Sequence, residues 1–269
     1  MDTNTIDKLL DALNVGNADE RLNIRFMLRY APFTVKGFTF PERGIDDLPV
    51  ERKAAENMIG FVRRLDKDRA KDPYIGAKAA SDMIYDKLID SLKTDKGVDV
   101  RILLAAIGAL GGYELMRGIT AAADGFTGEE LFKLNILIAE TNDGDKYLMG
   151  DFVGNQFRSF CMTAVQDGDL PAGKLLPISK YCAENIGSAD YWKSPYSEVI
   201  AVDAKALAEP FIERFSVFLD VCTLYPVERM MAYAFVANRV ITQTGDNFPK
   251  EAALSLLAEF GWRTSHFIA

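Results

Sequence analysis

The chain has 269 residues, of which 49% are hydrophobic and 11% aromatic, enough for a sizeable core and too many for an intrinsically disordered protein. It carries 31 lysine and arginine residues against 39 aspartate and glutamate residues, which gives a net charge of −8 at pH 7. Nucleic acids and anionic membrane surfaces are bound through clustered basic residues, so this balance disfavours both partners.

The compartment is indicated by three features. The N-terminal stretch MDTNTIDKLLDAL has no basic region followed by a long apolar one, so no secretory signal is expected. The longest apolar run, Ile102 to Gly112, is too short to span a bilayer. Cys161, Cys182 and Cys222 are odd in number and widely spaced, which does not suggest a disulfide framework. We therefore expect a soluble cytoplasmic protein whose thiols are small core residues.

The first fifty residues predict helix followed by irregular structure. Two short helices are expected before residue 31, with Asn17 or Asp19 as the N-cap of the second. Prolines and glycines then break the pattern between residues 31 and 49. This stretch is either a small edge hairpin around Lys36-Gly37 or an irregular arm.

Helices dominate the next part of the chain. Amphipathic spacing predicts helices over residues 50–65 and 74–92. The alternating charges of DKDRAKDP, residues 66–73, are typical of a solvated helix end or a linker. We therefore expect an N-terminal helical and irregular segment, residues 1–72, which can pack on a main helical domain, residues 73–269.

A helix rich in small residues is expected from about residue 98 to residue 116. Ala105, Gly108 and Gly112 are three and four residues apart, so they share one face and would let another backbone come close. Downstream, Thr127 and Glu130 fit a capping box that opens a short helix.

Four more helices are expected toward the C-terminus. They cover residues 157–165, 174–185, about 207–225 with Pro210 as a kink or first-turn residue, and 248–260. Between the last two, Met230 to Ile241 is apolar nearly all round and predicts a helix buried in the middle of the domain. The fold class is therefore mostly α (α+β), a helical bundle-like domain with one small antiparallel β-hairpin, residues 134–151.

The hairpin is predicted from NILIAETNDGDKYLMGDFVGN, residues 135–155. Asp143-Gly144 suits the two central positions of a type I′ turn, both of which need positive φ. That turn would place Glu140 opposite Tyr147 and Ile138 opposite Met149. A calcium loop is disfavoured, because Tyr147 and Met149 stand where oxygen ligands are needed and no closing glutamate follows.

The end of the hairpin resembles a known pattern. In a family of uncharacterised bacterial proteins, a strand ends in Gly-Asp, and a small or apolar pair and then an Asn follow. The stretch LMGDFVGNQF, residues 148–157, is similar to this motif. Residues 150–153 match that motif, whereas Gly154 precedes Asn155 and displaces the Asn by one position. The stretch GVDVRILLAAIGALGGYE is similar too, so the resemblance covers at most residues 74–269, less clearly the last third. The resemblance implies no activity.

Catalytic and metal-binding patterns are missing. His266 is the only histidine, and no nucleophile-elbow pattern surrounds a serine. No cysteine and histidine pairs have zinc-ligand spacing, and GALGGYE lacks the lysine of a P-loop. We therefore expect no catalytic residues, no metal and no cofactor.

The sequence favours a non-catalytic protein that acts through protein contacts or self-association, as a homo-oligomer or with an unknown protein partner. The alternative is a small-molecule binder, or an enzyme based on carboxylates, with a cleft between the hairpin end and the glycine-rich helix. Its candidate residues are Asp151, Glu114 and Asn155. For Asp151 we favour a structural role over a functional one: we expect its carboxylate to cap the helix that begins near residues 152–155.

Overall fold

The structure is a computed structural model that describes residues 6, 8, 10, 11, 15–142, 144–166, 172–188, 200 and 202–264, with only the main chain for residues 172–176. Within these residues, ten α-helices and one two-stranded sheet follow one another along the chain. The elements are α2 (Ala18–Tyr30), α3 (Arg52–Asp68), α4 (Ile75–Leu92), α5 (Val100–Ala123), α6 (Gly128–Lys133), β1 (Leu137–Glu140), β2 (Lys146–Met149), α7 (Asp151–Val165), α8 (Ala172–Glu184), α9 (Ala204–Cys222), α10 (Pro226–Thr244) and α11 (Lys250–Arg263). The predicted fold class, mostly α with one small antiparallel hairpin, is confirmed.

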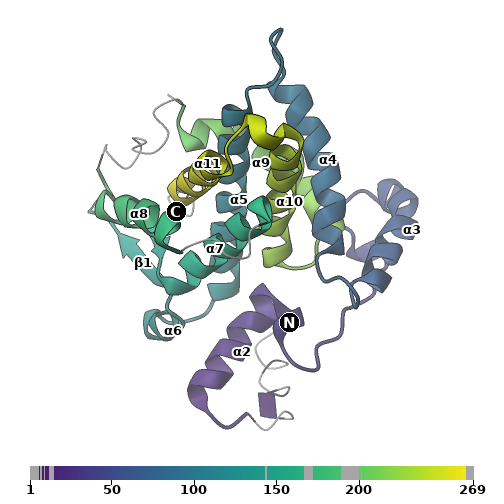
Figure 1. The fold of residues 1–269 in the computed structure, drawn as a ribbon. Coiled ribbons are helices and arrows are strands. Elements are labelled where there is room, and N and C mark those ends of the chain that lie inside the picture. The colour runs from purple at the N-terminus through teal and green to yellow at the C-terminus, as the bar shows by residue number, and fades with distance from the viewer. Residues whose placement is uncertain are drawn as a thin grey trace.

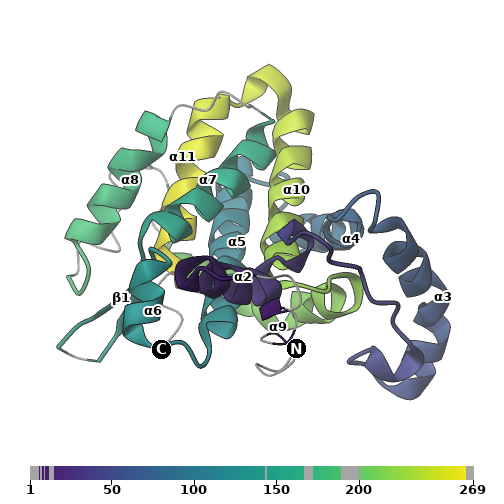
Figure 2. The same ribbon diagram turned by 90° about the horizontal axis from the view of Figure 1, so that it is seen from below.

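Helix α5 lies at the centre of the molecule (Figures 1 and 2). It packs along α10 and α11, and α9, α7 and α2 also contact it. By length and composition α5 is the one described helix that could cross a membrane, but 83% of its apolar window is buried inside the fold. Its apolar residues are therefore explained by its place in the core. Helix α10 is also buried along most of its length, as predicted for residues 230–241.

Small residues bring α5 and α11 close together. A Cβ added to Gly108 would lie 2.7 Å from the carbonyl oxygen of Leu257, and one added to Gly112 would lie 2.7 Å from the carbonyl carbon of Gly261. Side chains at these two positions would force the helices apart, because packed interiors have no room to absorb an extra methyl group. The prediction that this face of α5 admits another backbone is confirmed for Gly108 and Gly112.

The hairpin is present, but its predicted turn and register are wrong. Glu140 pairs with Lys146 rather than with Tyr147, and Ile138 pairs with Leu148. The Thr141 N–H donates to the Asp145 carbonyl at 2.9 Å, and the Gly144 N–H donates to the Thr141 carbonyl at 3.0 Å. Three residues therefore form the loop, and Gly144, with φ of 87°, supplies the left-handed residue of a turn followed by a bulge.

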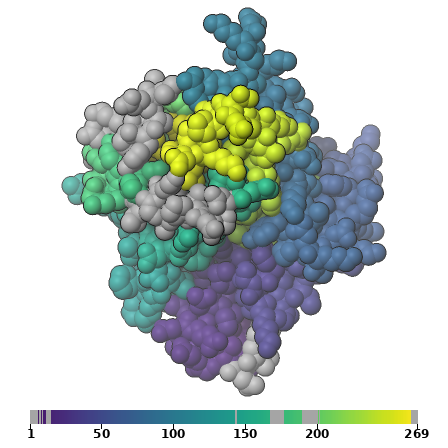
Figure 3. All heavy atoms as spheres, in the orientation of Figure 1, coloured from purple at the N-terminus to yellow at the C-terminus, as the bar shows by residue number. Residues whose placement is uncertain are grey.

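The N-terminal segment packs directly on the rest of the chain, as the purple and blue residues of Figure 3 show. Phe26 of α2 lies edge-on to Phe152 of α7, with ring centroids 5.1 Å apart. Residues 31–49 contain short 3₁₀ turns and no strand, so the irregular arm is the correct alternative. Phe33 and Phe38 of this arm contact the Tyr225 ring. The division into residues 1–72 and 73–269 stays a prediction.

Replacing Gly108 with Ala should lower the free energy of unfolding by about 1–3 kcal/mol, because the new methyl group meets the backbone of Leu257. The matched control is Gly60→Ala in α3, where nothing lies within 4 Å of the added Cβ. There the substitution should stabilise the helix by roughly 0.5–1 kcal/mol. Urea unfolding of both variants measures the difference, and a Gly108→Ala variant as stable as the parent would contradict the close contact.

Candidate functional site

The site begins at the junction between β2 and α7. Gly150 has φ of 106°, and a Cβ there would lie 2.9 Å from the carbonyl carbon of Asn135, so only glycine fits. The Phe152 N–H donates to the Asn135 carbonyl at 3.2 Å. This backbone contact fixes the direction in which α7 leaves the hairpin and therefore where its first turn presents its side chains.

The floor of the site is a pair of aromatic rings. Phe157 of α7 and Trp262 of α11 are stacked, with ring centroids 5.1 Å apart and an interplanar angle of 16°. Phe157 reaches α11 because the neighbouring Gly261 has no side chain; a Cβ at Gly261 would clash with the Phe157 ring. Both rings are almost fully buried, so their position is set by the core.

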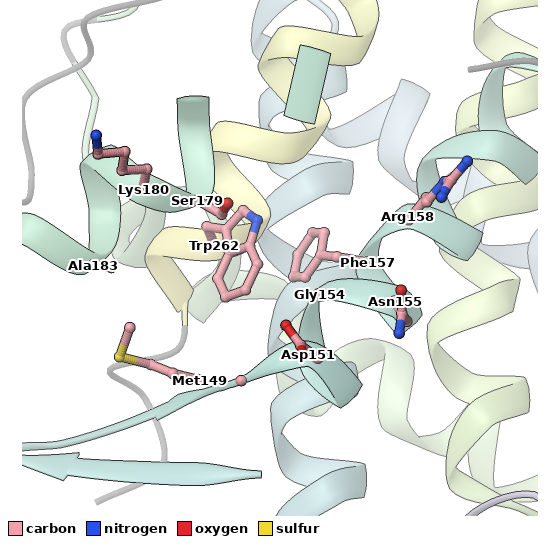
Figure 4. A pocket seen from close by; sticks show the side chains of 11 residues that line it. Met149, Asp151, Gly154, Asn155, Phe157, Arg158, Ser179, Lys180, Ala183 and Trp262 are labelled. Atoms are coloured by element: carbon pink, nitrogen blue, oxygen red, sulfur yellow. The ribbon is translucent and has the colours of Figure 1, made fainter. Parts of the chain in front are cut away.

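A groove of about 460 Å³ lies over this floor, between α7 and α8 (Figure 4). Its volume is in the range of roughly 300–1,000 Å³ that is typical of small-molecule sites. Most of the lining surface is apolar. The residues that line the groove are Met149, Gly150, Asp151, Gly154, Asn155, Phe157, Arg158, Ser179, Lys180, Ala183 and Trp262.

Charges of both signs line the groove. In Figure 4 the Asp151 side chain extends toward Trp262, while Lys180 and Arg158 lie at opposite ends of the site. Lys180 is on α8, 3.7 Å from Glu184. The Nε atom of Arg158 is buried, and no acceptor for it is present in the described part of the chain. In the described part of the chain, the groove therefore has one acid between two bases above an aromatic surface.

The three candidate residues from the sequence do not converge. Asp151 and Asn155 line the groove. Glu114 is buried elsewhere, where its Oε2 accepts a hydrogen bond from Arg229 Nε at 2.7 Å and lies 3.6 Å from Arg117 Nε. The groove is also bounded by α8 instead of the glycine-rich helix α5.

The prediction that Asp151 caps α7 is wrong. Gly150 is the N-cap residue, Asp151 is the first residue of the helix, and no side chain caps this end. The reason is the backbone contact with Asn135, which requires glycine at the junction and moves the carboxylate one position into the helix. An acid in the first turn still interacts favourably with the helix dipole.

Sequence reasoning missed the other polar residues of the groove. Arg158, Ser179 and Lys180, and Trp262 come from three different helices, α7, α8 and α11, so no local spacing connects them. The short spacing of Asp151, Asn155 and Arg158 on one face of α7 is the local signal that could have added Arg158, and that spacing is common on exposed helices.

A second cluster of charges is buried near the end of α3, where the sequence predicted a solvated end. Asp66 and Arg69 are almost completely inaccessible. Arg43 Nη2 donates to Asp66 Oδ1 at 2.8 Å, and Arg69 Nε donates to the same oxygen at 3.2 Å. Arg69 also forms an ion pair with Glu228 of α10. The expectation of a solvated segment at residues 66–73 is therefore wrong for Asp66 and Arg69.

This network connects the N-terminal arm to the junction between α9 and α10. Arg43 Nη1 donates to the Val221 carbonyl at 2.8 Å, and Arg69 donates to the Cys222 carbonyl. Burial alone raises the pKa of Asp66, but the hydrogen bonds and positive charge of Arg43, together with Arg69, outweigh it and hold that pKa below its ordinary value. The buried charges of this network are therefore paired and hydrogen-bonded, as buried charges must be.

The thiols are buried and the histidine falls outside the described residues. Cys161, Cys182 and Cys222 are free, and burial raises the pKa of the first two to about 12 and that of Cys222 to about 11. They are therefore protonated core residues at neutral pH. In the described part of the chain, no three potential metal ligands of the histidine, cysteine and carboxylate types come together.

Comparison of the chain with protein-family models, with curated proteins and with solved structures finds no match. The resemblance of residues 148–157 to a bacterial family therefore stays a prediction.

Replacing Asp66 with Asn should lower the free energy of unfolding by about 3–5 kcal/mol, because Arg43 and Arg69 would remain buried without their shared carboxylate. The matched control is Asp68→Asn, two residues away and exposed, which should change stability by less than about 0.5 kcal/mol. Chemical denaturation measures both. Equal effects in the two variants would show that the buried network does not hold the arm in place.

The contribution of Asp66 should also depend on pH. Its folded pKa lies below the ordinary value of 3.8, so folding favours the carboxylate. That contribution is complete above about pH 5 and is lost as the pH falls through the folded pKa. The stability difference between the parent and Asp66→Asn should therefore narrow between pH 6 and pH 3. A difference that stays constant over this range would contradict the lowered pKa.

Proposed function

We propose that the protein is a non-catalytic, cytoplasmic binding protein for a small amphoteric molecule that carries an ammonium group, a carboxylate and a flat apolar group. One observation carries the proposal: the α7–α8 groove combines a stacked aromatic floor with an acid placed between two bases. A molecule of amino-acid type has all three complementary features.

Each feature of the ligand has a partner in the groove. The apolar group would lie against Trp262, the more accessible of the two rings at 8% exposure, where burying flat apolar surface is favourable. The ammonium group would pair with the Asp151 carboxylate, which extends toward that floor. The ligand carboxylate would reach Arg158 or Lys180. Charge-assisted hydrogen bonds of this kind are stronger than neutral ones and fix the orientation of a ligand.

The same residues give little support to acid–base chemistry. Among the described residues, Asp151 is the one acid that lines the groove, whereas carboxylate catalysis usually needs two acids in different environments. Glu114, the second acid expected from the sequence, is paired with Arg229 in the interior. Binding without turnover is therefore the reading that these positions favour.

The compartment is proposed from the cysteines. Cys161, Cys182 and Cys222 are buried in the core as free thiols, and none of the three is in a disulfide. Proteins of oxidising compartments commonly use such residues in disulfides, whereas reduced thiols are the rule in the cytoplasm. A cytoplasmic location fits this pattern.

Phenylalanine is the simplest probe with all three features, and isothermal titration calorimetry should detect its binding to the parent protein. Asp151→Asn should weaken that binding about tenfold or more, since it removes a hydrogen bond between charged groups that contributes roughly 1.5–3 kcal/mol. Asp246→Asn serves as the control, because Asp246 is exposed and does not line the groove.

Two blocked derivatives test whether binding requires both charged groups of phenylalanine. N-acetylphenylalanine lacks the ammonium group and phenylalanine amide lacks the carboxylate, so each should bind more weakly than phenylalanine. If all three bind alike, the groove is only an apolar site and the charge argument fails. If none binds and a broad metabolite screen gives no thermal shift, the proposed function is wrong.

Contact with a protein partner or with a second copy is the other candidate function, and the exposed side chains of Phe132, Leu137 and Ile138 favour it. Size-exclusion chromatography with light scattering tests self-association. A strict monomer at all concentrations, with no partner that co-purifies, would count against this candidate.

A further inference from the structure

The outer edge of the hairpin has hydrogen-bonding groups that point away from the fold. Residues of an antiparallel pair bond to the partner strand at every second position. Because Thr141 and Asp145 are bonded to each other, Ala139 and Leu137 also bond toward β2, and the N–H and C=O groups of Ile138 and Glu140 face outward. In the described residues, no main-chain hydrogen bond reaches Ile138 or Glu140 from outside the hairpin.

Apolar side chains accompany this free edge. Leu137 and Ile138 of β1 are 43% and 52% exposed, and Phe132, at the end of the preceding helix α6, is 67% exposed. The facing residues of β2 are different: Tyr147 and Leu148 are buried. Figure 2 shows the hairpin projecting from the helical body. A strand with exposed apolar residues and unpaired backbone groups is a template for the addition of another strand.

The surroundings of the edge are acidic. Between Gly128 and Met149 the sequence has five acidic residues and two lysines, a local charge of −3. The nearby basic side chains are already next to acids: Lys133 is paired with Glu129 at 3.1 Å, Lys146 lies opposite Glu140 in the hairpin, and Arg25 of α2 lies 3.6 Å from Glu130. A basic partner would therefore be attracted to β1, and an acidic one would be repelled.

We propose that β1 binds an extended, basic segment of another protein, which adds to the hairpin as a third strand. The segment would bond to the outward groups of Ile138 and Glu140 and cover the Leu137 and Ile138 side chains. This surface is separate from the α7–α8 groove, and the inference does not depend on the proposed ligand. It specifies the kind of partner for the protein contacts that the sequence favours.

A second copy of the chain fits the edge less well, for two reasons. Stable interfaces between folded proteins bury about 1,200 Å² or more, and a four-residue strand with three exposed side chains falls well short of that area. Two copies would also bring two chains of net charge −8 together. A short peptide segment needs neither a large area nor a matching folded surface.

The test uses two acetylated and amidated hexapeptides, one alternating lysine and valine and the other alternating glutamate and valine. Fluorescence anisotropy should show saturable binding of the lysine peptide to the parent protein, weakened by high salt, and no binding of the glutamate peptide. If both peptides bind equally, or if neither binds, the proposal is overturned.

Two variants locate the binding. Ile138→Pro removes one outward N–H and an exposed apolar side chain, and it leaves the bonds toward β2 in place. It should weaken the binding of the lysine peptide at least tenfold. Val217→Ala, at an exposed position on α9, should leave that binding unchanged. Glu140→Lys keeps the backbone groups and reverses the charge, so it should also weaken the binding of the lysine peptide. It provides a second test if the proline variant folds poorly.

Unchanged binding in both Ile138→Pro and Glu140→Lys would overturn the location on β1. Analytical ultracentrifugation of the parent protein without peptide tests whether a second copy binds to the edge. A concentration-dependent dimer that disappears in Ile138→Pro would mean that a second copy occupies the edge, and the proposal of a basic partner segment would then be wrong.

Discussion

The close approach of α5 and α11 sets the packing at the centre of the fold. Two glycines of α5 face the backbone of α11 at a distance that no side chain would permit. Gly261, on the same part of α11, leaves space for the Phe157 ring and so allows it to stack on Trp262. The floor of the candidate groove is therefore a direct product of the packing in the centre of the fold.

The position of α7 follows from a second backbone contact of the same kind. Gly150 passes close to Asn135, and this contact turns the chain from the hairpin into the helix that carries Asp151 and Arg158. The groove is thus defined by two places where main chain packs against main chain, and its charged residues lie on helices α7 and α8. Sites built in this way hold their polar groups in fixed positions, which favours specific recognition.

The buried charges near α9 have a different role. Arg43 and Asp66 belong to the N-terminal segment, whereas Glu228 belongs to α10. Pairing charges in the interior contributes little net stability compared with apolar packing, but the loss of one partner is costly. The network therefore specifies how the N-terminal arm meets the helices, while the aromatic contacts of the arm supply apolar packing at the same place.

Several parts of this arrangement could be predicted from the sequence, because local spacing determines them. The small-residue face of α5, the capping box of Thr127 and Glu130 and the N-cap at Asn17 all follow from residues within one or two turns. The hairpin was also predictable, but its register was not, since a two-residue and a three-residue loop both suit the same acidic turn.

Properties that depend on distant residues could not be predicted. Asp66 and Arg69 look solvated in the sequence, and only the approach of Arg43 and Glu228 makes their burial possible. Asp151 is of a residue type that commonly caps helices, yet the contact of Gly150 with Asn135 decides which residue takes the N-cap position. The groove itself requires Lys180 and Trp262, from α8 and α11, to meet the first turns of α7.

The most direct test of the groove as a ligand site is the fluorescence of Trp262. The chain has two tryptophans, and the substitution Trp192→Phe leaves Trp262 as the only one. Titration of this variant with phenylalanine should produce a saturable change in the emission of Trp262, because the bound ring would lie on the indole. N-acetylphenylalanine amide, which has the same ring and neither charge, should produce a much smaller change. An emission that is insensitive to both molecules, or that responds to both equally, would contradict the proposed recognition.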